Sequence, residues 1–221
     1  MHLSPFLDHT VLAPATTLRE ITQLCNEAVE HAFAAVCVPP TYVAHAAAFL
    51  GESSVKTCTV IGFPLGYSTT DTKLHEAREA IAAGATELDM VQHLGMLKNG
   101  DWNYLKEEAQ RMMALICSEG AVLKIILETA ALTKEEIVRC CDIYAPLSVH
   151  FLKTSTGFHP AGGASVEAVK TLRAHLPQAL QIKASGGIRT FAFAKELIDA
   201  GASRIGASAS VALVKEGAEM A

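Results

Sequence analysis

Five charged side chains interrupt short apolar runs that otherwise have the character of buried strands. They are Asp8, Asp89, Lys124, Lys153 and Lys183. Lysine is almost never fully buried without a partner, so three of them in such runs need an explanation. Each one taken alone is consistent with a simple ion pair or with an edge residue that faces water. All five in the strands of one sheet indicate a cluster of amines and carboxylates in a small volume.

Such a cluster could carry out amine chemistry. Desolvation and neighbouring ammonium groups lower the pKa of a lysine, from about 10.4 toward about 7 to 8. The free amine then attacks an aldehyde or ketone and forms a Schiff base. The resulting iminium draws electrons from the adjacent carbon–carbon bond, and a carboxylate with a second lysine can relay the protons. We therefore expect lysines with lowered pKa values at the centre of this site.

Two glycine-rich segments follow the last two apolar runs. They are residues 185–189 and 204–210, and Gly157 lies in a similar position after Lys153. Glycine lets backbone N–H groups approach an anion closely, and a helix N-terminus adds a favourable partial charge. Any one of these glycines could be an ordinary turn residue, but together they indicate a site for a phosphorylated substrate. The predicted phosphate-binding residues are Gly157, Gly186, Gly187, Gly206 and Ser208.

Eight short apolar runs alternate with helical patterns along the chain. We expect strands over residues 5–10, 34–38, 55–62, 86–91, 122–128, 148–154, 180–185 and 203–207. The runs are apolar on both faces, as parallel strands covered by helices must be. No linker divides the chain, so the sequence predicts an α/β fold in which residues 1–221 form a single (β/α)8 TIM barrel. An open doubly wound sheet is the structural alternative, although the first strand–helix joint carries no GxGxxG motif.

A barrel of this kind would position both groups of residues. Its catalytic side chains lie at the C-terminal strand ends, and phosphate binds on the loops after strands seven and eight. The helices between the strands have clear start signals. Thr17 with Glu20 and Thr133 with Glu136 are predicted capping boxes. Further helix starts are expected near Asp71, Asp101 and Thr190.

The composition excludes several functional classes. Half of the 221 residues are apolar, 19% are charged and the net charge is −5, so neither disorder nor a nucleic-acid footprint is indicated. Residues 31–51 lack charged side chains, but Pro39 and Pro40 favour a strand, a turn and a helix over a membrane span. Six cysteines without a CxxC motif, and no signal peptide, predict a reducing, cytoplasmic setting. Nine histidines without HxH or HExxH spacing predict no metal site.

Several motifs resemble those of the deoxyribose-phosphate aldolase family. Residues 151–158, FLKTSTGF, resemble the Schiff-base signature of that family, and residues 182–189, IKASGGIR, resemble its second lysine motif. The other matching segments are 8–10 (DHT), 35–38 (AVCV), 60–66 (VIGFPLG), 87–91 (ELDMV) and 204–208 (RIGAS). The resemblance covers nearly the whole chain, in order.

The resemblance implies a class I, metal-independent aldolase without a cofactor. It would reversibly cleave 2-deoxy-D-ribose 5-phosphate to D-glyceraldehyde 3-phosphate and acetaldehyde in deoxyribose phosphate catabolism. Lys153 would form the Schiff base, and Asp89 and Lys183 would be the proton donor and acceptor pair. The residues implied for the rest of the pocket are Lys124, Asp8, Thr10 and Cys37. The implied partners are the sugar phosphate and acetaldehyde, with no nucleic acid and no membrane, and the choice between a homodimer and a homotetramer stays open.

Three features depart from the family's pattern. Gln92 and His93 stand where the family more often has an apolar residue followed by asparagine, and Pro39-Pro40 replaces a single proline. Both lie at strand ends, where a difference in substrate preference is expected. The chain ends at Met220-Ala221 without the terminal tyrosine that some relatives use near the substrate, which bears on the late proton transfer and the rate.

Two other functions fit part of the pattern. A phosphate-binding barrel isomerase that works by proton transfer alone would not require the lysine pair. A non-enzymatic barrel that binds a sugar phosphate would take up its ligand without a covalent adduct. At the level of the residues both alternatives stay open.

Overall fold

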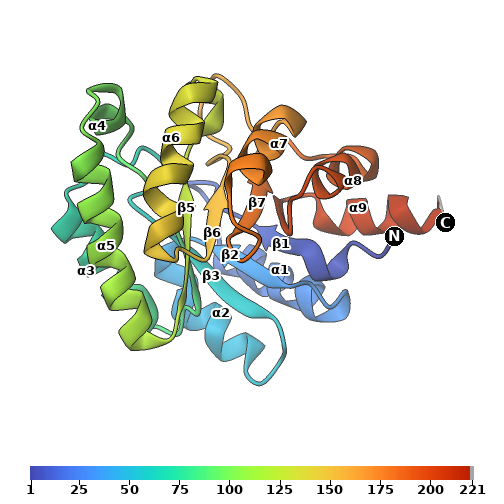
Figure 1. Ribbon diagram of the computed structural model, residues 1–221. Coiled ribbons are helices and arrows are strands. Elements are labelled where there is room, and N and C mark those ends of the chain that lie inside the picture. Colours follow the sequence, from blue (N-terminus) through green and yellow to red (C-terminus); the bar gives the residue numbers. More distant parts are fainter. Residues whose placement is uncertain (220–221) are drawn as a thin grey trace.

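Eight parallel strands form the centre of the molecule. In the computed structural model, which describes residues 1–219, they close into one barrel in the order β1 to β8 (Figure 1). Their bounds are β1 Leu7–Thr10, β2 Ala35–Val38, β3 Lys56–Ile61, β4 Glu87–Val91, β5 Val122–Ile126, β6 Phe151–Lys153, β7 Gln181–Ser185 and β8 Arg204–Ala207. The predicted (β/α)8 barrel is therefore confirmed. The end of the chain at residues 220–221, where no tyrosine stands, lies outside the described residues.

Helices surround the barrel (Figure 1). They are α1 Leu18–Glu30, α2 Val43–Leu50, α3 Thr70–Ala82, α4 Leu94–Lys98, α5 Trp102–Glu119, α6 Lys134–Tyr144, α7 Val166–His175, α8 Phe191–Asp199 and α9 Ser210–Glu219. Both predicted capping boxes are confirmed, at the starts of α1 and α6. Asp101 and Thr190 are the N-caps of α5 and α8, whereas α3 begins after Thr69 and Asp71 lies in its first turn.

The two faces of the strands carry different residues. Side chains such as Val36 and Leu88 belong to the large apolar core, which the strands share with the helices. The residues that alternate with them point into the barrel, because successive side chains of a strand face opposite sides. Four of these inward residues form a small separate apolar cluster, Ala35, Cys37, Cys58 and Val60. Several others are charged, and Asp8, Asp89, Lys124, Lys153 and Lys183 are the exceptions to the apolar pattern that the sequence indicated.

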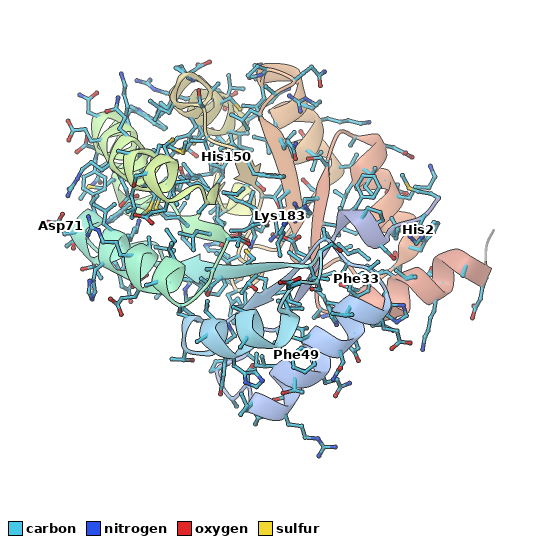
Figure 2. The ribbon with its side chains drawn as sticks, turned by 90° about the horizontal axis from the view of Figure 1, so that it is seen from below. His2, Phe33, Phe49, Asp71, His150 and Lys183 are labelled. Atoms are coloured by element: carbon cyan, nitrogen blue, oxygen red, sulfur yellow. The ribbon has the colours of Figure 1, made fainter. Side chains whose placement is uncertain are left out.

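The register of the strands places the charged residues close to one another along the barrel axis. Asp89 pairs with Lys124 across β4 and β5, and Lys153 pairs with Lys183 across β6 and β7. Asp8 of β1 pairs with Gly206 of β8. In the view of Figure 2, Lys183 lies near the centre of the molecule, whereas Phe49 and Asp71 lie toward its periphery. The sheet thus concentrates the charged side chains along the barrel axis.

All eight strands are shorter than the predicted runs, by one to four residues. β5 ends at Ile126, so Glu128 falls in the loop that follows, with backbone φ 58° and ψ 58°. β6 spans three residues, and Ser148, at φ 57°, adopts a left-handed conformation that ends a short 3-10 helix before it. Residues 31–51 contain β2, a 3-10 turn over Pro40–Tyr42 and α2, as predicted. Within residues 1–219 no helix has the length and apolar character needed to cross a membrane.

Candidate active site

Three lysines from three strands meet at one carboxylate, that of Asp89. Lys124 Nζ lies 2.8 Å from Asp89 Oδ1. Lys153 Nζ lies 2.7 Å and Lys183 Nζ 2.8 Å from the other oxygen, Oδ2. The Asp89, Lys124 and Lys183 side chains are fully buried, and that of Lys153 is 4% exposed. The three residues with the central implied roles, Lys153, Asp89 and Lys183, are thus in direct contact.

A second layer of charges lies toward the N-terminal ends of the strands. Lys183 donates to Asp8, and Lys124 Nζ lies 2.6 Å from the carboxylate of Glu87. Arg204 closes this layer, with one nitrogen 2.6 Å from Asp8 and another 3.3 Å from Glu87. Glu87 and Arg204 are the first residues of their strands and were given no role at the level of the sequence. Their signal was the same as that of the lysines, a charge inside a buried run.

The carboxyl groups of the cluster are held in their charged form. Burial raises the pKa of Asp89, but the charges of Lys124, Lys153 and Lys183 outweigh it, and the pKa lies well below its usual value. Burial acts on Asp8 in the same direction, and Lys183 and Lys124 bring its pKa down to about 2. Both carboxylates therefore stay ionised at neutral pH.

The pKa values of Lys124 and Lys183, which lie beneath the cavity, are shifted in the opposite direction. Burial lowers the pKa of Lys183, but Asp8 and Asp89 outweigh it, and the net direction is upward. Burial also lowers the pKa of Lys124, and Asp89 is the largest of the charges that reverse this and hold the pKa well above its usual value. The expected lowering of lysine pKa values is wrong for these two, because carboxylates and not ammonium groups are their nearest charged neighbours.

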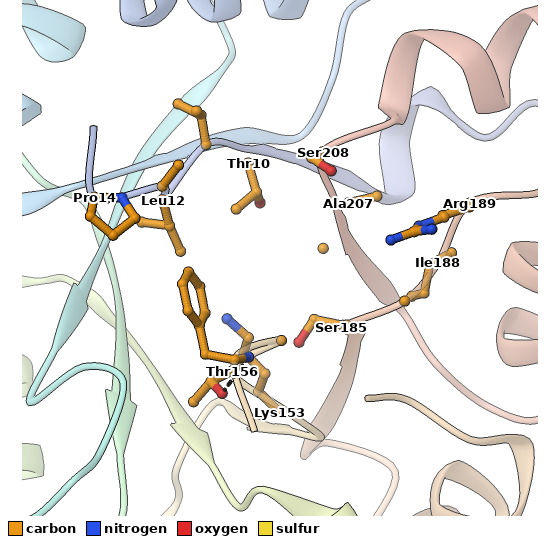
Figure 3. A pocket seen from close by; sticks show the side chains of 17 residues that line it. Thr10, Leu12, Pro14, Lys153, Thr156, Ser185, Ile188, Arg189, Ala207 and Ser208 are labelled. Atoms are coloured by element: carbon orange, nitrogen blue, oxygen red, sulfur yellow. Dashed lines mark hydrogen bonds between the residues drawn. The ribbon is translucent and has the colours of Figure 1, made fainter. Parts of the chain in front are cut away.

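A cavity of about 410 Å³ opens above the cluster (Figure 3). Lys153, at the C-terminal end of β6, lines this cavity, whereas Lys124 and Lys183 do not. Thr10 lines it from the end of β1. A small molecule in the cavity would therefore meet one amine directly. The other two amines contact Asp89 and do not line the cavity.

All five predicted phosphate-binding residues line the same cavity. They are Gly157, Gly186, Gly187, Gly206 and Ser208. Gly186 has φ 91°, and a Cβ atom there would lie 2.9 Å from the Cα atom of Gly163, so a side chain fits neither the backbone nor the space. Helix α9 begins two residues after Ser208. Close backbone N–H groups and a helix N-terminus are the features that bind a phosphate group. Arg189, exposed and also lining the cavity, adds a positive charge that the sequence did not single out.

Three of the residues implied for the pocket lie below the cavity wall. Asp8 and Lys124 belong to the buried ion cluster. Cys37 is fully buried beside Cys58, whose Sγ atom lies 3.2 Å from Asp89 Oδ1. None of the three lines the cavity in the described part of the chain. Their contacts place them around Lys183 and Cys58, the neighbours of Asp89.

The residues that depart from the family's pattern also lie away from the cavity. Gln92 is fully buried and donates to the carbonyl oxygen of Leu127 over 2.8 Å, while its own oxygen accepts from the Tyr144 hydroxyl. His93 is the N-cap of α4 and accepts from the N–H of Met96. Gln92 ties the end of β4 to the segment after β5 and to α6, and His93 caps α4. Neither residue lines the cavity in the described part of the chain, so no contact with the cavity supports their expected effect on substrate preference.

Among residues 1–219, two groups of side chains have the donor atoms and spacing of a metal site. One is Cys37, Cys58 and Asp89, and the other is Asp8, Cys58 and Glu87. In both groups the carboxylate oxygens already contact Lys124, Lys183 or Arg204. The positive charge that a metal ion would supply is therefore provided by side chains.

Known proteins of similar sequence and structure share the whole fold. The family described as DeoC/LacD family aldolase matches residues 4–217. "Deoxyribose-phosphate aldolase" of Thermoanaerobacter sp. (strain X514) is 50% identical over 217 residues, which cover 98% of this chain and 97% of the relative. The protein of the same name from Mannheimia succiniciproducens is 46% identical over 96% of this chain and 94% of its own length.

Comparison with solved structures gives the same result as comparison with these sequences. A putative deoxyribose-phosphate aldolase from Coccidioides immitis superposes with a TM-score of 0.93 at 38% identity, covering 98% of this chain and 86% of that one. The tetrameric deoxyribose phosphate aldolase from Aeropyrum pernix gives 0.92 at 32% identity, covering 99% and 92%. Sequence and structure thus agree over nearly the full length, and this chain belongs to the DeoC/LacD family of aldolases.

Proposed function

We propose that this chain is a class I aldolase that reversibly cleaves 2-deoxy-D-ribose 5-phosphate to D-glyceraldehyde 3-phosphate and acetaldehyde. The observation that carries the proposal is the position of Lys153. Its amine contacts Asp89, which Lys183 also contacts, and it lines a cavity whose glycine-rich wall fits a phosphate group. A reactive carbonyl carbon at Lys153 and an anion at the glycines are the two ends of a sugar phosphate.

The reaction begins with the neutral amine of Lys153. It attacks carbon 1 of the open-chain sugar, and loss of water from the carbinolamine gives an iminium. The bond between carbons 2 and 3 then breaks, and its electron pair forms the double bond of an enamine while the hydroxyl on carbon 3 loses its proton. Glyceraldehyde 3-phosphate leaves, carbon 2 takes up a proton, and water releases acetaldehyde from Lys153. An amine that forms such intermediates acts by covalent catalysis.

The ion cluster makes Lys153 share its carboxylate. Asp8, Glu87 and Asp89 are three carboxylates, and Arg204, Lys124 and Lys183 are three cations in contact with them. The amine of Lys153 contacts Asp89 at the same oxygen as Lys183 does. It is also the one of the three lysine amines that lines the cavity in the described part of the chain, where a carbonyl compound can reach it.

Asp89 and Lys183 are the proposed proton carriers. One oxygen of Asp89 contacts both Lys153 and Lys183, so protons can pass between the reacting amine and the second lysine through hydrogen-bonded groups. Lys124 holds the other oxygen and fixes the orientation of the carboxylate. General acid–base catalysis by groups placed in this way contributes on the order of 10²–10⁴ in rate.

The proposed phosphate site and the whole-chain organisation complete the proposal. Gly157, Gly186, Gly187, Gly206 and Ser208 would hold the phosphate, and Arg189 would add charge. Residues 1–221 would act as a single catalytic domain without a cofactor. We also propose a cytoplasmic homo-oligomer, a homodimer or homotetramer. Six free cysteines, five of them buried, fit a reducing compartment, and sedimentation of the purified protein would measure the assembly.

The proposal is tested by product analysis with matched variants. The wild-type protein is expected to release acetaldehyde from 2-deoxy-D-ribose 5-phosphate, Lys153→Ala to release none, and the control Lys170→Ala, on the exposed side of α7, to match the wild type. Conversion of the sugar phosphate without release of acetaldehyde, if it survives in Lys153→Ala, would favour an isomerase that works by proton transfer alone. Wild-type protein that binds the sugar phosphate and leaves it intact would favour a binding barrel.

A further inference from the structure

Glu128 combines two features that are unusual for a glutamate. The residue is only 1% exposed to solvent, and its backbone adopts the left-handed conformation at φ 58°. Non-glycine residues in this region are uncommon and are held there only by their surroundings. The N–H groups of Leu127 and Thr129, on either side, donate to the carbonyl oxygens of Lys153 and Thr154. Glu128 is therefore fixed against the strand that carries Lys153.

The carboxylate of Glu128 holds Thr156, the third residue after Lys153. The N–H of Thr156 donates to Oε1 over 3.2 Å and to Oε2 over 3.3 Å, and the Thr156 hydroxyl donates to Oε2. The N–H of Phe158 in turn donates to the Thr156 hydroxyl oxygen over 3.1 Å. A hydroxyl group has one proton and two lone pairs. The proton and one lone pair of Thr156 are thus already used inside the protein.

The remaining lone pair determines what Thr156 offers to a ligand. Thr156 lines the cavity together with Lys153, and Figure 3 shows both at the same edge of it. Because its proton is donated to Glu128, the hydroxyl can only accept a hydrogen bond from a bound molecule. A carbonyl oxygen or a fully ionised phosphate group has no proton to donate there. A substrate hydroxyl does.

We propose that Glu128 is a positioning residue that makes Thr156 a hydrogen-bond acceptor for the hydroxyl on carbon 2 of the acceptor aldehyde. This inference rests on the proposed function. In D-glyceraldehyde 3-phosphate that hydroxyl lies between the carbonyl carbon, which reacts with the enamine that Lys153 carries, and the phosphate. Thr156 occupies the corresponding place in the chain, between Lys153 and Gly157. The pair Glu128–Thr156 therefore selects acceptor aldehydes that carry a hydroxyl beside the carbonyl group.

The variant Glu128→Gln tests the inference, because it keeps the size of the side chain and changes its polarity. The backbone N–H of Thr156 needs an oxygen, which leaves the amide NH₂ group to face the Thr156 hydroxyl. The amide then donates to that hydroxyl and fills its free lone pair, so the hydroxyl proton turns toward the cavity. Rates of condensation with acetaldehyde are compared for D-glyceraldehyde 3-phosphate and for 3-oxopropyl phosphate, which lacks the hydroxyl.

We expect the wild type to prefer the hydroxylated aldehyde in kcat/KM, and Glu128→Gln to lose about tenfold of that preference, the effect of one hydrogen bond. The loss should appear as a higher KM with kcat little changed, since binding before and during reaction is affected equally. Thr156→Ser, which keeps the hydroxyl, should retain the preference. Thr156→Val should lose it as Glu128→Gln does, and the exposed control Glu119→Gln should behave as the wild type.

Equal losses with both aldehydes in Glu128→Gln would show a merely structural role and overturn the inference. An unchanged preference in Glu128→Gln or in Thr156→Val would overturn it as well. In both cases the wild type still makes product, so the proposed function stands. A wild-type protein that condenses neither aldehyde with acetaldehyde would contradict the proposed function itself, and this inference with it.

Discussion

Lys153 and Lys183 are register partners on the neighbouring strands β6 and β7, and both amines contact the same carboxylate oxygen, Oδ2 of Asp89. One of the two lysines lines the cavity and the other is fully buried. This difference divides the proposed work between them. Lys153 meets the substrate, and Lys183, held by Asp8 and Asp89, supplies and removes protons behind it.

Replacing Lys183 by methionine should separate these two tasks. Lys183→Met keeps much of the side-chain volume and removes the amine, so we expect turnover to fall on the order of 10²–10⁴ while Lys153 still condenses with acetaldehyde. Steady-state kinetics and a mass measurement of the reduced adduct would check this. A variant that turns over normally would contradict the role of Lys183 as a proton carrier.

Replacing Asp89 by asparagine should affect stability as well as rate. The buried lysines lose their shared counter-charge, and removal of one partner from a buried ion pair destabilises a protein by about 3–5 kcal/mol. We expect Asp89→Asn to lower the free energy of unfolding in urea by that order and to lose almost all turnover. Full stability in this variant would show that the lysines find other compensation, contrary to the contacts described.

The phosphate site should respond to a side chain at Gly186. A Cβ atom there meets the Gly163 backbone, so Gly186→Ala is expected to raise KM for the sugar phosphate more than for unphosphorylated 2-deoxy-D-ribose. Gly120→Ala is the matched control, because it has φ 68° and nothing within 4 Å. The control should lose about 1–2 kcal/mol of stability from the left-handed backbone and leave both KM values unchanged. An equal rise for both sugars in Gly186→Ala would contradict the assignment.

Acid should weaken the barrel through Asp8. Its pKa is about 2 in the folded protein, against an ordinary value of 3.8 for the unfolded chain, so the folded protein binds the proton more weakly. The resulting stabilisation is present above about pH 4 and is lost as the pH falls through about 2. Urea denaturation at a series of pH values should show the free energy of unfolding of the wild type falling over this range. Asp8→Asn should be less stable at neutral pH and show a shallower fall, and parallel curves would contradict the account.

The barrel and the central residues could be predicted because their signals are local. A lysine or aspartate in a buried run is visible in the sequence, and the period of two along a strand already tells which charges share a face. Asp89, Lys153 and Lys183 were found in this way. Gly186, Gly187 and Gly206 stood out because glycine-rich segments followed the last two strands.

What the sequence could not provide is the balance of charges and the paths of the loops. Lys124 and Lys183 have raised pKa values because Asp8, Glu87 and Asp89 lie between them, and those distances exist only in the closed barrel. Glu128 was expected within the fifth strand, and its left-handed backbone redirects its carboxylate to Thr156. Such contacts join residues that are far apart in the chain, so no local sequence pattern predicts them.

Trapping of the covalent intermediate tests the central claim most directly. The protein is incubated with acetaldehyde and sodium borohydride, which reduces an imine to a stable N-ethyl amine, and the modified peptide is then mapped by mass spectrometry. We predict a single ethyl group, on Lys153, and none in Lys153→Ala. An adduct on Lys183 or Lys124, or an unmodified protein that still cleaves the sugar phosphate, would contradict the account.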